Sequence, residues 1–144
     1  MTTSDDEASI RDLVERLTEA IRARDVEAAM AVFAADIVSF DLGPPLQHGG
    51  GEAFRRRWQA LFAAYQGPIG YEVRELALAI GDGVAFSHSL NCTSGVAADK
   101  RHVERWVRWT AGYRKSGGQW RIVHEHVSVP ADVPSGKAVF DLKP

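Results

Sequence analysis

Two histidines in the C-terminal part of the chain have residue types and spacing suited to acid–base chemistry. His124 and His126 are two residues apart in the run from Trp120 to Val129. Side chains two residues apart on an extended strand share a face, and an imidazole transfers protons near neutral pH. Strict alternation predicts one face made of Trp120, Ile122, His124, His126 and Ser128.

The same histidines have two further interpretations. A buried histidine is commonly satisfied by one hydrogen bond and is then purely structural, which applies equally to His88, His124 and His126. Two histidines on a strand could also bind a metal together with Asp41 or His88. The chain contains no CxxC, HExxH or carboxylate ladder, so we expect neither a metal site nor a cofactor.

Asp41 is the carboxylate with the clearest potential for chemistry. It ends a short apolar stretch and directly precedes the loop that contains Gly43 and Pro44. A buried aspartate at this point could act as a general acid or base. Alternatively, the residue forms an Asx turn that begins the loop, and the sequence leaves both interpretations open.

The strand before the two histidines alternates aromatic and basic side chains. Trp106 and Arg108 share one face and Arg105 and Trp109 the other, so the pattern does not select the inner face. Small-molecule pockets are mostly apolar with a few placed polar groups. We therefore expect ligand contacts from Trp58, His88, Trp106, Arg108, Trp109 and Trp120.

Helices in the first half of the chain and strands in the second must position these residues. Apolar side chains recur at helical spacing over residues 5–23, 25–35 and 54–65, which predicts three helices. Ser4 and Glu7 have the form of a capping box, and residues 37–41 are typical of a short strand. From residue 70 onward, four long extended runs separated by turn residues predict an antiparallel meander.

The composition is that of one α+β domain. Of the 144 residues, 45% are hydrophobic and 25% are charged, which is typical of a globular domain. We expect a single domain over residues 1–144, with an irregular tail at residues 131–144. The formal net charge of −2 gives no reason to bind nucleic acid, and the chain has no apolar run long enough for a membrane span. The acidic start and the single cysteine, Cys92, favour a cytoplasmic location.

Four segments resemble the SnoaL-like, ketosteroid isomerase-like branch of the NTF2-like superfamily. They are residues 31–36, Phe40-Asp41, the step from His48-Gly49 into a helix, and residues 119–128. The resemblance implies a cone in which three N-terminal helices pack in the concave face of a curved, mostly antiparallel sheet. It also implies a pocket and a homodimer formed through the sheet.

The resemblance extends to one catalytic position. Asp41 falls where ketosteroid isomerases carry their general-base aspartate, whereas their two oxyanion donors are replaced by Leu17 and Trp109. One such donor contributes roughly 3 kcal/mol to catalysis. We therefore predict against efficient ketosteroid isomerase activity.

The sequence supports three hypotheses about function. The first is a protein that binds a small apolar molecule of unknown identity in its pocket. The second is a cofactor-independent isomerase, cyclase or hydrolase of a small apolar carbonyl-type metabolite, with Asp41, His124 or His126 as general acid or base. The third is a non-catalytic dimeric interaction module whose histidines complete the core.

Overall fold

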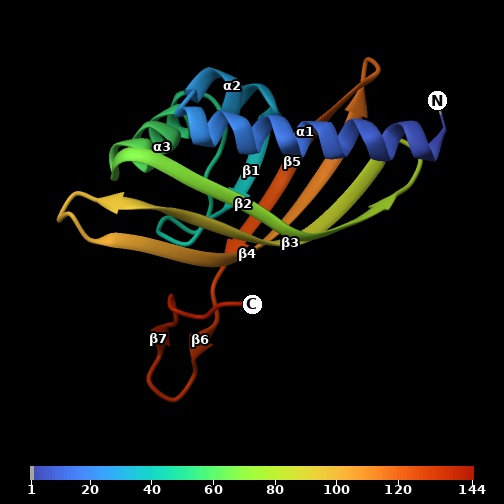
Figure 1. Ribbon diagram of the computed structural model, residues 1–144. Coiled ribbons are helices and arrows are strands. Elements are labelled where there is room, and N and C mark those ends of the chain that lie inside the picture. Colours follow the sequence, from blue (N-terminus) through green and yellow to red (C-terminus); the bar gives the residue numbers. More distant parts are fainter. Residues whose placement is uncertain (1) are drawn as a thin grey trace.

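The computed structural model describes residues 2–144 and contains a curved sheet with helices on one face (Figure 1). The strand order in this five-stranded sheet is β1-β5-β4-β3-β2. Strands β2 to β5 form the predicted antiparallel meander, and β1 adds a parallel edge beside β5. The strands are β1 (Phe33–Phe40), β2 (Tyr65–Ile80), β3 (Val84–Ala97), β4 (His102–Ser116) and β5 (Gln119–Ser128). The fold is therefore α+β with a mixed sheet.

Helix α1 (Thr3–Ala23) runs along the sheet and begins earlier than the sequence pattern predicts (Figure 1). Its capping box is formed by Thr2 and Asp5, so the prediction of a box at Ser4 and Glu7 is wrong. The Thr2 hydroxyl accepts a hydrogen bond from the Asp5 backbone, and the Asp5 carboxylate accepts one from Thr2. These bonds satisfy orphan N–H groups at the helix start.

Helices α2 (Val26–Ala31) and α3 (Glu52–Ala63) are both shorter at their C-terminal ends than predicted. We expected the second helix to continue to about residue 35, but β1 begins at Phe33. The Ile122 backbone N–H donates to the carbonyl of Val32, so strand pairing replaces the helical hydrogen bonds from this point. Likewise, β2 begins at Tyr65, a residue that we expected in the third helix.

Strand β5 contains a β-bulge that changes which side chains face the helices. Ile122 pairs with Tyr113 and His124 with Gly112, so Val123 is the extra residue. A one-residue insertion moves all later side chains to the opposite face. The predicted single face of Trp120, Ile122, His124, His126 and Ser128 is therefore wrong beyond Ile122: Glu125 is buried in this face, and His126 is exposed.

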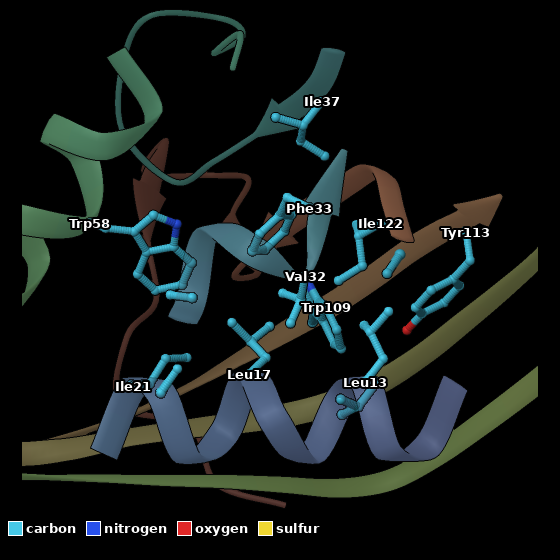
Figure 2. Close-up of a cluster of buried hydrophobic side chains, with 14 of the residues drawn as sticks. Leu13, Leu17, Ile21, Val32, Phe33, Ile37, Trp58, Trp109, Tyr113 and Ile122 are labelled. Carbon is cyan, nitrogen blue, oxygen red and sulfur yellow. The ribbon is translucent and has the colours of Figure 1, made fainter. Parts of the chain in front are cut away.

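The hydrophobic core lies between α1 and the inner face of the sheet. Figure 2 shows Leu13, Leu17 and Ile21 pointing from α1 toward side chains of the sheet. On β4, Trp109 and Tyr113 are almost completely buried, which settles the parity that the sequence left open. The inner face of β4 is therefore the one that contains Arg105 and Trp109. Burial of its apolar surface stabilises the fold by about 25 cal/mol per Å².

The C-terminal tail is more regular than we expected. It contains a short hairpin of β6 (Ala131–Asp132) and β7 (Lys137–Ala138). Beyond the hairpin, the Phe140 ring lies 5.0 Å from the Arg105 guanidinium carbon, and Lys143 lies 3.7 Å from Glu104. The end of the chain thus returns to the beginning of β4. None of the helices in residues 2–144 combines the length and apolar character needed to cross a membrane.

Candidate functional site

A mainly apolar cavity of about 190 Å³ lies between the helices and the inner face of the sheet. Leu17 and Ile21 of α1 and Trp58 of α3 form part of its wall, opposite Val107 and Val127. Exposed lining residues, including Leu42, Leu61 and Arg105, mark its mouth. The cavity therefore has mainly apolar walls and reaches the surface beside these exposed residues.

A buried carboxylate, that of Glu125, lies in the wall of this cavity. Only 5% of the residue is exposed. The Ser39 hydroxyl donates to its Oε2 over 2.8 Å, and the Trp109 indole N–H donates to its Oε1 over 3.0 Å. Sequence reasoning missed Glu125 because strict alternation assigns it to the face opposite Trp120 and the two histidines, and the bulge at Val123 has no clear signal in the sequence.

Arg57 of α3 connects Glu125 with Asp41. Its Nε donates to Asp41 over 2.7 Å, its Nη1 donates to the Ser39 hydroxyl over 3.3 Å, and its Nη2 lies 3.7 Å from Glu125. We call Ser39, Asp41, Arg57 and Glu125 the carboxylate–arginine cluster. Two carboxylates share one guanidinium in this cluster, so its formal charge is negative.

A second polar group reaches the cavity from β2 and β3. The Ser89 hydroxyl donates to Asn91 over 2.7 Å, and the Asn91 amide donates to the Tyr71 hydroxyl over 2.7 Å. Burial raises the pKa of Tyr71 above its ordinary value of 10.0, so the phenol stays protonated at neutral pH. Within residues 2–144, the Tyr71 O–H has no acceptor, which leaves it able to donate a further hydrogen bond.

Trp58 lines the same cavity and has an unusual indole group. Its Nε1 is buried and has no hydrogen-bond partner in the described part of the chain. The rings of Phe33 and Phe62 lie 6.0 and 5.7 Å from the Trp58 ring, so packing fixes its position. A buried N–H without a partner typically costs about 1–3 kcal/mol.

The cavity includes three of the residues that the sequence predicted for the site, Asp41, Trp58 and Trp109. His124 lies outside its lining, where its Nδ1 donates to the Val38 carbonyl over 2.7 Å. His126 is exposed, and its ring centroid lies 5.5 Å from that of Phe40. The prediction that both histidines share one face with Trp120 is wrong because of the bulge in β5.

The remaining predicted residues also lie outside the cavity lining. His88, Trp106 and Arg108 project from the outer face of β3 and β4, opposite the buried side chains of those strands. Trp120 is buried near the beginning of α1, where its indole N–H donates to Asp6 over 3.0 Å. Among residues 2–144, no group of three or more His, Cys, Asp or Glu side chains is arranged to hold a metal ion.

Comparisons with solved structures place the chain among NTF2-like proteins. It is similar over its full length to an NTF2-like protein of unknown function from Pseudomonas putida KT2440, with 37% identity, 100% of both chains covered and a TM-score of 0.88. A proposed aromatic ring hydroxylase from Novosphingobium aromaticivorans shares 21% identity, with 88% of this chain and 90% of that chain covered and a TM-score of 0.77.

A third structure, a proposed scytalone dehydratase from Novosphingobium aromaticivorans, shares 12% identity, with 85% and 83% of the two chains covered and a TM-score of 0.76. The last two similarities concern the fold alone. No curated protein matches the chain. The model of the SnoaL-like domain family matches residues 10–132, which is most of the sequence. The chain therefore belongs to the SnoaL-like domain family.

Proposed function

We propose that this protein binds a small, mainly apolar molecule in the cavity and that Glu125 meets the polar centre of this ligand. The observation that carries the proposal is the burial of a carboxylate between apolar walls. A buried charge is costly unless it is paired and hydrogen-bonded, and a carboxylate has about four acceptor positions. Ser39 and Trp109 occupy two of these positions, so acceptor capacity remains for a ligand.

The volume of the cavity limits the size of this ligand. An engineered apolar cavity of about 150 Å³ holds one benzene molecule, and the cavity here measures about 190 Å³. It therefore suits one ring with a short substituent, or a branched chain of similar size. A skeleton of four fused rings would exceed it.

The polar groups of the cavity also support a second candidate function, cofactor-independent proton transfer. Glu125 provides a base, Asp41 lies on the other side of Arg57, and Tyr71 can donate a hydrogen bond to a carbonyl oxygen. A base at hydrogen-bond distance from an acidic C–H, with a donor at the neighbouring oxygen, is the arrangement that enolisation requires. In this enzyme hypothesis Glu125 replaces the two histidines as the candidate general base, and Asp41 is retained as the second carboxylate.

Binding is tested by thermal unfolding with a panel of single-ring alcohols, phenols and ketones. A ligand at 100 times its Kd adds roughly 2.7 kcal/mol, which raises the Tm by several degrees. We expect Glu125→Gln to weaken binding of the alcohols about fivefold, because a hydrogen bond to a charged acceptor is stronger than one to a neutral amide. His126→Ala is the matched control outside the cavity and should bind like the wild type.

The catalytic candidate is tested by NMR, as the exchange of the α-protons of the same ketones in heavy water. The protein should accelerate exchange, and Glu125→Gln should abolish the acceleration without loss of the folded spectrum. A panel in which no compound raises the Tm would reject the binding proposal. Binding without accelerated exchange would reject the catalytic candidate alone.

A further inference from the structure

The mouth of the cavity carries a guanidinium group that has no carboxylate partner. Two arginines line the cavity, Arg57 and Arg105. Arg57 is paired with Asp41 at 2.7 Å. Arg105 is exposed on the inner face of β4, and within residues 2–144 its side chain forms neither an ion pair nor a hydrogen bond. Its positive charge is therefore available to a ligand that occupies the cavity.

The C-terminal tail holds this arginine without using its hydrogen-bond donors. The Phe140 ring lies 5.0 Å from the guanidinium carbon of Arg105 in a cation–π contact. Such a contact engages the face of the planar guanidinium. The five N–H donors lie in the plane of the group and remain free at its edge. Phe140 is thus a positioning residue for Arg105.

Arg105 and Glu125 give the two ends of the cavity opposite charge. Trp109, which donates to Glu125, is four residues beyond Arg105 on the same face of β4. At about 3.4 Å per residue, the Cα atoms of Arg105 and Trp109 are roughly 14 Å apart. A ligand with an anionic group would be attracted at the Arg105 end and repelled at the Glu125 end, which fixes its orientation.

From this arrangement we propose that the ligands are single-ring or short branched monocarboxylic acids with a hydroxyl group at the other end: the carboxylate binds Arg105 at the mouth, and the hydroxyl is the polar centre that donates to Glu125. The single unpaired guanidinium matches one unit of negative charge, and its fork fits the two oxygens of a carboxylate. The apolar remainder of the ligand lies in the cavity beneath. This inference rests on the proposed binding function and names the chemical class that the same site selects.

The test compares 4-hydroxyphenylacetate with its uncharged isostere 4-hydroxyphenylacetamide by isothermal titration calorimetry at neutral pH and low salt. We expect the wild type to bind the carboxylate about fivefold more tightly, which is the range of a solvent-exposed ion pair. Arg105→Met should remove this preference and leave the Kd of the amide unchanged. Phe140→Ala should reduce the preference, and added salt should weaken it in the wild type.

Arg56→Met is the matched control, because it removes the same charge from an exposed residue outside the cavity lining. Its preference for the carboxylate should equal that of the wild type. Equal binding of acid and amide by the wild type would overturn the role of Arg105 and leave the pocket itself supported. A preference that persists in Arg105→Met would also overturn it. A wild type that binds neither compound would overturn this inference, whereas the binding proposal fails only if no alcohol, phenol or ketone of the panel raises the Tm. Arg105→Gln provides a second test if the methionine variant does not fold.

Discussion

Arg57 shows how one residue type determines the electrostatics of the cavity. Its planar guanidinium reaches Asp41, Ser39 and Glu125 through three different nitrogen atoms. The guanidinium carbon also lies 5.0 Å from the Phe54 ring centroid, which holds the side chain against α3. A lysine would supply one compact charge and could not bridge the same three groups. The geometry of the carboxylate–arginine cluster therefore depends on the fork of an arginine.

Tyr113 leads to a prediction about alkaline pH. Burial raises the pKa of Tyr113 from 10.0 to about 12 in the folded protein. Between these two pH values the unfolded chain loses the phenolic proton and the folded chain keeps it. The free energy of unfolding should therefore be unaffected by this group below pH 10 and fall above it, by about 1.4 kcal/mol per pH unit.

Urea denaturation across this alkaline range measures the effect, with Tyr113→Phe as the control. The variant loses the hydrogen bond between Tyr113 and Ser87, which is 2.8 Å long, so it should be less stable at neutral pH. Its stability should nevertheless fall less steeply above pH 10 than that of the wild type. Equal slopes for the two proteins would show that Tyr113 does not titrate as its burial requires.

At the scale of elements, Asp6 connects the beginning of α1 to the hairpin between β4 and β5. Its Oδ1 accepts hydrogen bonds from Lys115 over 2.9 Å and from the Trp120 indole over 3.0 Å. These two donors, Lys115 first, lower the pKa of Asp6 below its ordinary value of 3.8. The link thus stabilises the fold fully above pH 3.8, the ordinary pKa of an aspartate. This stabilisation is lost as the pH falls through the lower pKa that Asp6 has in the folded protein.

Asp6→Asn should therefore lower the Tm at neutral pH, because the amide keeps the shape of the side chain and loses its charge. The difference from the wild type should disappear in acid, where the wild-type carboxyl is also neutral. Asp12→Asn is the matched control, since Asp12 is exposed on the same helix and within residues 2–144 forms an ion pair with Arg16 alone. Differential scanning calorimetry measures the Tm of both variants. An equal loss of Tm in Asp6→Asn and Asp12→Asn would contradict the link.

The sequence predicts the meander and part of the candidate site, but it does not predict the bulge in β5 or the early end of α2. The meander follows from long extended runs between turn residues, and Asp41, Trp58 and Trp109 were all predicted for the site. Glu125 was not predicted for the site, because the extra residue Val123 reverses the alternation of side chains in β5 and no residue type marks such a bulge. The pairing of β1 with β5 explains the early end of α2, since contacts distant in sequence override local helical spacing.

The parity of β4 was undecidable from its sequence for a similar reason. Both faces combine tryptophan and arginine, so only packing against α1 distinguishes them. The same packing places Arg105 at the mouth of the cavity and Arg108 on the outer face. Likewise, the return of the tail from β7 to Arg105 and Glu104 depends on one aromatic contact and one ion pair, which no periodic pattern reveals.

At the scale of the whole molecule, the outer face of the sheet supports the proposal of a homodimer. Val84 and Phe86 are each 56% exposed on β3, although both are large apolar residues. Phe86 pairs with Ala79, and His88 pairs with Ala77, so small side chains of β2 lie beside both residues. A stable dimer buries about 800 Å² on each partner, and the outer face of a five-stranded sheet can supply such an area.

Phe86→Glu should therefore give a folded monomer, because a two-fold interface through this face would bring the two introduced charges into an apolar contact. Sedimentation velocity measures the change, with the wild type expected to sediment as a dimer. Leu46→Glu is the matched control: Leu46 is 97% exposed in the loop between β1 and α3, and its replacement should leave the dimer intact. A monomeric wild type would contradict the proposal of a homodimer. A Phe86→Glu variant that still sediments as a dimer would show that the interface lies on another surface.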